Sequence, residues 1–302
     1  MKGMVVVSDL LPRRLSPGLV LRSLRQPSVG GTVDKAFDRA MGSLVNIDEF
    51  WMSARYFAPH PHAGFSAVTY MLPSSSGGFR NRDSLGEDCN IAPGALHSTE
   101  AGAGMLHEEM PQQDGVECHG LQLFIKVRPE LELAAPRAQH LRADQVPHVE
   151  RDGVTSRVLF GALTCLEHSL ALGRVNDSGT GPCVATPLQS HGSVDLCDLL
   201  LSVDAEAGVL GDPERGAFAM VLGGRGLADG RPISPGQALT WPAGHRCLFA
   251  SRDEPLQILV GCGEALAGPV LNEGPFFAYS EDRLQDYVRR YASGDMGVLA
   301  RE

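Results

Sequence analysis

Alternating apolar and polar residues mark two short stretches of the chain as β-strands. Residues 121–127 (LQLFIKV) follow the period of two that a half-buried strand requires, and Pro129 ends the run. Residues 43–50 (SLVNIDEF) form a second run with β-branched and apolar positions. The second run leads into a segment whose polar residues carry the chemistry of the chain.

A different period near the end of the chain predicts a helix over residues 280–293. Ser280 can cap its start, two acidic residues follow the cap, and Gly294 can end it. The apolar positions three and four residues apart lie on one face of this helix: Leu284, Tyr287, Val288 and Tyr291. An amphipathic helix of this kind packs on a neighbouring surface, so we expect a structural role for it.

The two halves of the chain share a sequence pattern. Residues 218–224 (FAMVLGG) resemble 68–73 (VTYMLP), and residues 233–244 (ISPGQALTWPAG) resemble 91–94 (IAPG) and the later turn at Gly104. Such self-similarity predicts two stacked units of the same kind. The polar, proline-bearing run 134–147 is then expected to cross between them.

Four polar residues of the first half have the spacing of a metal site. Side chains alternate across a strand, so His60 and His62 point to one side, and His107 and Glu109 also share a side. A single HxH pair can equally serve ordinary hydrogen bonding. The second pair, with glycine turns before it, favours a site of three imidazoles and one carboxylate.

The second half serves as an internal control for this metal site. Counting along the repeat places Leu210 and Asp212 near the positions of His60 and His62, and Cys247 and Phe249 at those of His107 and Glu109. Leu and Phe cannot bind a metal, so the four residues of the first half are not a requirement of the fold. Cys247 could be a ligand or a reactive thiol, although a free cysteine is usually a small buried apolar residue.

Composition and charge exclude several classes of protein. The 302 residues carry 26 basic and 36 acidic side chains, a net charge of −10 without a basic stripe, which argues against direct binding of nucleic acid. Seven cysteines without a CxxC pair form no disulfide framework, and no secretory leader opens the chain. No run approaches the roughly 18 apolar residues of a membrane span. We therefore expect a reduced, cytoplasmic protein.

The motifs of the first half resemble those of the cupin barrel, and their arrangement resembles the pirin family. HxH, a PG turn and GxGxxH follow the cupin signature, while pirins place HxE in the second motif. The matching segments are PHPHAGFSAVTYML (59–72), RDSLG (82–86), PG (93–94), AGAGMLHEEM (101–110), HGLQLF (119–124) and the closing residues 274–297. Asn81 stands where pirins often show His, and Ser98 where many show Trp, which bears on the shape of the cavity.

This resemblance implies an all-β fold of two stacked cupin barrels, each a double-stranded β-helix or jelly roll, with a C-terminal amphipathic helix. Residues 1–140 would form the metal-binding barrel, and residues 141–302 a barrel without metal ligands. Asp48 and Glu49 lie close to the histidines in sequence, but in pirins this region packs near the site without binding the metal. His97 is the most credible substitute ligand, and His119 could hydrogen-bond to a ligand. His140, His148, His168, His191 and His245 form no recognisable constellation.

The ligand set predicts one divalent transition metal. Nitrogen and oxygen ligands without thiolates suit Fe(II), our first choice, with Mn, Ni, Co, Cu and Zn as alternatives. The resemblance implies a quercetin 2,3-dioxygenase-like activity on a flavonol-like substrate, with Glu109 as a ligand or as the catalytic base. The alternative is a redox-sensitive regulatory protein that acts through protein partners without catalysis.

Overall fold

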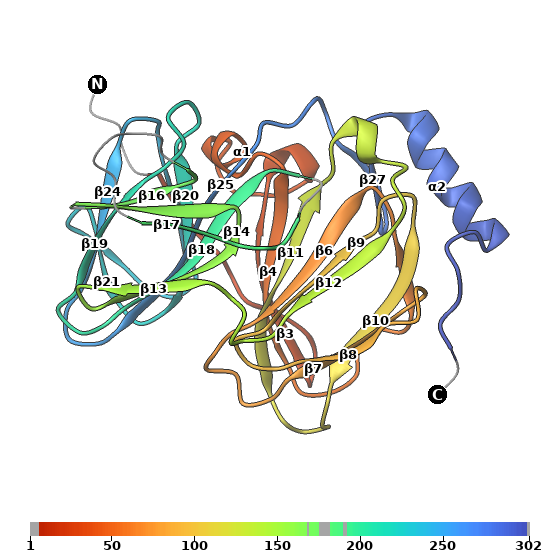
Figure 1. The fold of residues 1–302 in the computed structure, drawn as a ribbon, viewed down its shortest axis with the longest axis horizontal. Helices are drawn as coiled ribbons and strands as arrows, with labels where there is room; N and C mark the ends of the chain where they lie inside the picture. Colours follow the sequence, from red (N-terminus) through yellow and green to blue (C-terminus); the bar gives the residue numbers. More distant parts are fainter. Residues whose placement is uncertain (1–5, 168, 175–181, 190–191, 301–302) are drawn as a thin grey trace.

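The structure, a computed structural model, describes residues 6–167, 169–174, 182–189 and 192–300. Its strands form two β-sheet units that lie side by side, the first half of the chain on the right of Figure 1 and most of the second half on the left. The helix of the C-terminal segment lies at the outer end of the first unit. The expected all-β fold of two units with a C-terminal helix is confirmed.

The first unit consists of a seven-stranded and a four-stranded sheet that enclose the candidate site. The larger sheet runs in the order β12 (Arg137–Leu141), β9 (Leu96–Glu100), β6 (Phe65–Met71), β11 (Cys118–Lys126), β4 (Leu44–Met52), β3 (Leu19–Arg25) and β2 (Arg13–Ser16). The smaller sheet runs β5 (His60–His62), β10 (Met105–Pro111), β7 (Phe79–Asp83) and β8 (Asp88–Ile91).

The second unit consists of two seven-stranded sheets. One runs β1 (Val6–Asp9), β23 (Gln237–Trp241), β20 (Ala217–Gly223), β25 (Leu256–Gly263), β18 (Val194–Leu201), β14 (Val154–Phe160) and β13 (His148–Arg151). The other runs β17 (Cys183–Ala185), β15 (Ala162–Leu166), β16 (Ser169–Leu172), β19 (Glu206–Leu210), β24 (Arg246–Ser251), β21 (Gly226–Ala228) and β22 (Arg231–Ile233). Apolar side chains of both sheets fill the space between them.

The internal repeat is visible in the strand order. The run β9, β6, β11, β4 of the first unit has the same order as β23, β20, β25, β18 of the second. The turns that precede β9 and β23 both need a glycine, because Gly94 and Gly236 have φ angles of 82° and 88°, which other residues rarely adopt. The repeated PG motif therefore encodes the same turn twice.

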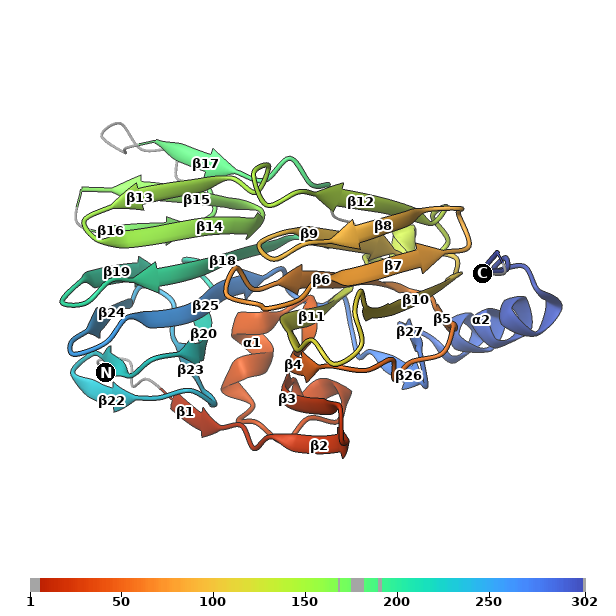
Figure 2. The same ribbon diagram turned by 90° about the horizontal axis from the view of Figure 1, so that it is seen from below.

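The two ends of the chain each pack on the other half. Strand β1 pairs with β23, so the start of the chain completes a sheet of the second unit. At the other end, β26 (Leu271–Glu273), β27 (Phe276–Ala278) and α2 (Glu281–Ser293) lie against the first unit, as Figure 2 shows. The predicted helix is confirmed: the Ser280 side chain accepts a hydrogen bond from the Arg283 amide, and Leu284 and Tyr287 are buried.

A buried lysine fixes this C-terminal segment to the first unit. The Lys126 ammonium is fully buried and donates to the Glu132 carboxylate at 2.7 Å and to the Gly64 carbonyl at 2.9 Å. The ammonium also lies 4.2 Å from the centre of the Tyr279 ring. The backbone N–H of Tyr279 donates a hydrogen bond to the Glu132 carboxylate. The hydroxyl of Tyr287, on α2, donates to the Glu132 carbonyl at 2.7 Å.

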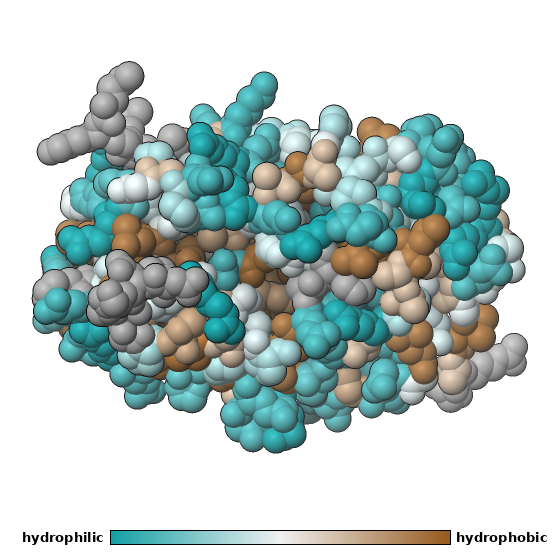
Figure 3. All heavy atoms as spheres, turned by 45° about the horizontal axis from the view of Figure 1, so that its top comes forward, coloured by the Kyte–Doolittle hydropathy of each residue, from teal (hydrophilic) through white to brown (hydrophobic). Residues whose placement is uncertain are grey.

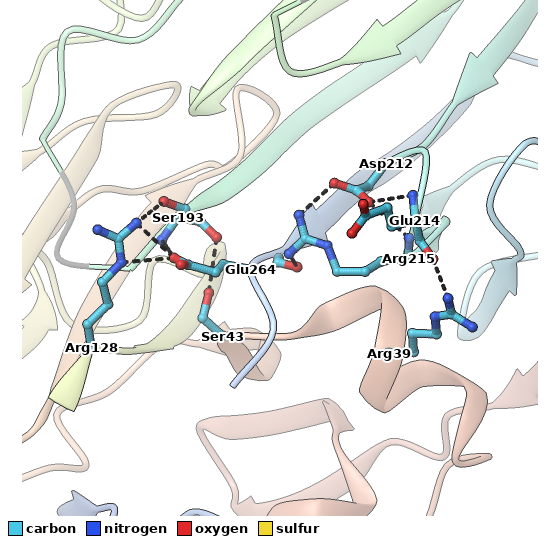
Figure 4. A network of polar contacts seen from close by, with 9 residues as sticks. Arg39, Ser43, Arg128, Ser193, Asp212, Glu214, Arg215 and Glu264 are labelled. Atoms are coloured by element: carbon cyan, nitrogen blue, oxygen red, sulfur yellow. Dashed lines mark hydrogen bonds and ion pairs between the residues drawn. The ribbon is translucent and has the colours of Figure 1, made fainter. Parts of the chain in front are cut away.

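The two units share a continuous apolar core and a band of polar contacts at its edge. Val68 and Leu123 of the first unit belong to the same buried cluster as Leu196 and Phe218 of the second, and α1 (Ala36–Met41) contributes to it. At the edge, Arg128 contacts Glu264 at 2.9 Å and Ser193 at 2.8 Å (Figure 4). Half-exposed pairs of this kind contribute little, so the apolar core holds the units together.

The expected crossing between the units is shorter than the sequence suggested. Within residues 134–147, β12 forms a strand that pairs with β9, because the alternating side chains of residues 137–141 extend the sheet of the first unit.

Two short 3-10 helices, Pro27–Val29 and Pro129–Leu131, complete the elements. The face in Figure 3 is mainly hydrophilic with scattered hydrophobic patches. Within the described ranges, no helix has the length and apolarity needed to cross a bilayer.

Candidate metal centre

The three predicted histidines meet at one point in the first unit. Strands β5 and β10 pair so that His60 lies directly opposite His107, and His62 is two residues further on the same face. The ring centres are 4.7 to 4.8 Å apart, and their ligand nitrogens all lie within 4.8 Å of one another. The spacing of HxH and HxE thus gathers three imidazoles where a single ion can contact them.

Hydrogen bonds orient two of the three rings. His60 Nδ1 lies 2.9 Å from the Ala58 carbonyl, and His107 Nδ1 lies 3.2 Å from the Asn81 side-chain oxygen. Because both partners are acceptors, each Nδ1 carries the proton, which leaves the lone pair on Nε2. This is how proteins orient metal-binding histidines. Asn81 therefore positions His107, a role that sequence reasoning missed because it depends on the pairing of β7 with β10.

Burial keeps the three imidazoles neutral. It lowers the pKa of His60 and of His107, and it lowers the pKa of His62 to about 3, with His60 adding a further decrease. A neutral imidazole is the form that binds a metal. These residues therefore fit a transition-metal ion without a change of protonation at neutral pH.

Glu109 lines the same cavity but stands outside the compact histidine group. Its Oε1 lies 2.6 Å from the Thr69 hydroxyl on β6, which is itself 2.9 Å from the Gln122 side-chain oxygen. Burial raises the pKa of Glu109 to about 7, although the Thr69 contact opposes this shift. Its role as fourth ligand stays a prediction, and the raised pKa suits a group that exchanges protons near neutrality.

The other acidic residues near the motif face different ways. Asp48 points into the cavity, where Ser23 and Asn46 donate hydrogen bonds to its carboxylate. Glu49 is one residue further along β4 and points to the other face, where it contacts Arg22 and His119 at 2.9 Å each. His119 thus supports Glu49 and touches none of the three histidines.

The three histidines form part of the wall of an aromatic cavity of about 410 Å³. This volume lies in the range of small-molecule sites. Its polar groups besides the histidines are few, with Glu109, Asp48 and Gln122 among them. The aromatic wall consists of six phenylalanines: Phe50, Phe57, Phe65, Phe79, Phe124 and Phe277. A flat apolar molecule with one or two polar groups matches such a lining.

The equivalent place in the second unit is filled by apolar side chains. Val209 on β19 lies opposite Cys247 on β24, as His60 lies opposite His107. Val209, Cys247 and Phe249 are fully buried in the core, and burial raises the pKa of the Cys247 thiol far above its usual range. Cys247 is therefore an apolar core residue, as the commoner reading of a free cysteine implied.

One further group of possible ligands exists among the described residues. Cys89, His97 and His140 have ligand atoms within 4.8 Å of one another. His97, the most credible substitute should one of the four predicted ligands fail, lies in this group and not with the three histidines. The reading of His140 as part of no constellation is wrong, because β12 places it beside His97. His168 and His191 lie outside the described residues.

Chelation is expected to leave the first unit folded. Its buried clusters contain more than twenty apolar side chains of the first half and do not depend on the histidines, unlike the small core of a zinc finger. Thermal melts with and without a chelator, followed by circular dichroism, test this. Complete unfolding of that unit on chelation would contradict the expectation.

Comparisons with known proteins show which proteins this chain is similar to. The profile of the Pirin family matches residues 34–125. A pirin-like protein of Caulobacter vibrioides is 41% identical over 107 residues, which cover 35% of this chain and only 38% of that protein. A pirin-like protein of Solanum lycopersicum is 27% identical over 97% of this chain and 93% of its own length.

A solved structure shares the whole fold. Quercetin 2,3-dioxygenase from Acinetobacter baumannii superimposes with a TM-score of 0.76 at 17% identity, covering 98% of this chain and 99% of that one. Together with the matched family profile and the relative aligned over nearly its full length, the motifs around the three histidines support the pirin family for this chain.

Proposed function

We propose that this protein is a metal-dependent dioxygenase that acts on a flavonol-like aromatic substrate. The observation that carries the proposal is the meeting of three neutral histidines with a buried carboxylate in one phenylalanine-lined cavity. A dioxygenase of this kind needs a metal, a base and an apolar space for flat rings. The likeness to a quercetin 2,3-dioxygenase supports the substrate class.

The residues that would hold the metal are His60, His62 and His107, with Glu109 proposed as a fourth ligand. Nitrogen and oxygen donors without thiolate suit Fe(II) first, and Mn, Ni, Co, Cu or Zn as alternatives. When bound, each of these ions would supply Lewis acidity, and a redox-active one such as Fe would also supply one-electron chemistry with dioxygen, which Zn cannot.

The protein's own groups would prepare the substrate. The Glu109 carboxylate accepts the proton of the substrate's 3-hydroxyl, which becomes an enolate, and Thr69 holds that carboxylate in place. Phe65 and Phe124, whose ring centres are 4.8 Å apart, give the aromatic rings an apolar wall and keep water from the site. Each of these roles belongs to a residue that lines the cavity or contacts one that does.

Oxygen uptake tests the proposal directly. Protein reconstituted in turn with Fe, Mn, Ni, Co and Cu is incubated with quercetin while dissolved oxygen and flavonol absorbance are followed. We expect oxygen consumption and bleaching with at least one metal. The absence of both with every metal would reject flavonol oxidation.

The second candidate is a regulatory protein that binds a protein partner in a metal-dependent way. It is favoured by the loop before β5, where Tyr56 and Phe57 are about 40% exposed next to His60. Metal binding at His60 would change the surroundings of this loop, since His60 already contacts the Ala58 carbonyl. A protein without oxygenase activity whose loop changes exposure on metal binding would fit this candidate.

Replacing His62 or His107 with Ala is expected to abolish iron or manganese binding at this site, because each change removes one of three imidazoles. Elemental analysis after iron reconstitution should fall from one equivalent to a small fraction of one. His148→Ala, at an exposed position on β13, should keep the full equivalent. An iron equivalent retained by a protein lacking both His62 and His107 would contradict the assignment.

A further inference from the structure

We propose that Cys89, His97 and His140 form a second metal site, for a zinc-like ion, distinct from the three-histidine site. The three residues come from three strands of the first unit: β8 in the smaller sheet, and β9 and β12 in the larger one. His97 and His140 are directly paired across β9 and β12, so both side chains lie on the same face of the larger sheet.

The geometry fits one small ion. Cys89 Sγ lies 3.4 Å from His97 Nδ1, and a ligand atom from each of the three residues lies within 4.8 Å of the others. In a tetrahedral zinc site, bonds of about 2.3 Å to sulfur and 2.0 to 2.1 Å to nitrogen place the sulfur about 3.6 Å from each nitrogen. The group thus needs only small side-chain shifts to close on an ion.

The hydrogen bonding of this group is incomplete without a ligand. His97 is 2% exposed, and its Nε2 has no hydrogen-bond partner among the described residues; the same holds for His140 Nδ1. Leaving a buried polar atom unpaired costs about 1–3 kcal/mol. The neighbouring rings lie 5.8 Å apart and are tilted by 45°. An ion bound to Cys89 and to His97 Nδ1 would take His140 as its third ligand, because only one nitrogen of each imidazole can bind the same ion.

The donor set selects a different metal from the first site. One thiolate and two imidazoles suit zinc or another borderline to soft ion, whereas the three-histidine site lacks sulfur. The ion would displace the thiol proton of Cys89 to solvent and bond to the resulting thiolate, with the fourth position left for water. Cys89 and His140 are both partly exposed, which gives an ion a path to the buried His97.

The second site would stand beside the first without sharing a ligand. Cys89 pairs with Asn81, the residue that orients His107, and His97 pairs with Thr69, the residue that contacts Glu109. Each of these links runs through the backbone of a neighbouring strand. The two sites can therefore be emptied separately by substitution.

Cobalt(II) titration of the full-length protein tests the proposal, because only a bound thiolate gives an intense sulfur-to-cobalt charge-transfer band in the near ultraviolet. The His62→Ala/His107→Ala protein, with the first site removed, is expected to show this band saturating at one equivalent. Adding Cys89→Ser to it should abolish the band, and adding His140→Ala instead should weaken cobalt binding at least about 10-fold. Cys183→Ser, at an exposed cysteine, should change neither.

Two results would overturn the second site. The first is no charge-transfer band in the protein that lacks His62 and His107, with circular dichroism showing that it is folded. The second is a band that survives Cys89→Ser, which would assign the sulfur to another cysteine. Neither result bears on the dioxygenase, whose test is oxygen uptake by protein with an intact three-histidine site.

Discussion

Glu109→Gln protein is expected to oxidise quercetin at least about 100-fold more slowly than the wild-type protein at matched metal content. Gln keeps the shape of the side chain and one oxygen that can contact Thr69 or a metal, but it cannot accept the substrate's hydroxyl proton. Loss of a general base commonly lowers a rate by a factor of about 100 or more. Initial rates of oxygen uptake measure the effect.

The same chemical change on the surface provides the control. Glu117→Gln, at an exposed residue before β11, should retain wild-type turnover. Metal content must be measured in every sample, since a lost ligand and a lost base would otherwise look alike. Unchanged turnover in the Glu109→Gln protein with equal metal would show that another group removes the proton.

Lys126→Met is expected to destabilise the protein by about 3 kcal/mol or more. Burial lowers the pKa of Lys126 to about 8, so the ammonium is still charged at neutral pH and faces the Glu132 carboxylate. Removing one partner of a buried ion pair leaves the other charge poorly compensated, which typically costs 3–5 kcal/mol. The measurement is the free energy of unfolding from urea titration, with circular dichroism as the probe.

Two further variants test whether the loss of stability comes from the buried Lys126–Glu132 pair and not from removing any charged side chain. Arg142→Met removes an exposed partner of Asp144 and should cost less than about 1 kcal/mol. The double change Lys126→Met/Glu132→Gln should recover part of the loss, because it removes the unpaired carboxylate as well. Equal stabilities for Lys126→Met and wild-type protein would show that Arg283, 3.5 Å from Glu132, compensates alone.

Local pattern was enough to predict two central strands, β4 and β11, and the three-histidine group. His60, His62 and His107 could be found because alternation within a strand fixes which side chains share a face, and two such pairs sufficed. The repeated PG turn and the capped C-terminal helix are equally local signals, and both are present in the structure. Each of these features could be predicted because it depends only on residues a few positions apart in the sequence.

Features that depend on the register between distant strands could not be read from the sequence. Cys89, His97 and His140 meet only because β8 faces β9 across the unit and β12 pairs with β9. His140 lies in the run 134–147, which the sequence predicted to be a crossing between the units and not a strand. The orienting role of Asn81 depends in the same way on the pairing of β7 with β10. Phe277 of the cavity wall belongs to a segment far from the motif.

The packing of β26, β27 and α2 on the first unit determines the order in which the candidate site can form during synthesis. A ribosome releases the three histidines well before Phe277 and the segment that Lys126 anchors. Domains usually fold from the N-terminus as they leave the ribosome. Here the first half has its three histidines long before Phe277 completes the cavity wall, so the nascent chain would expose the histidines to any available ion until that residue emerges.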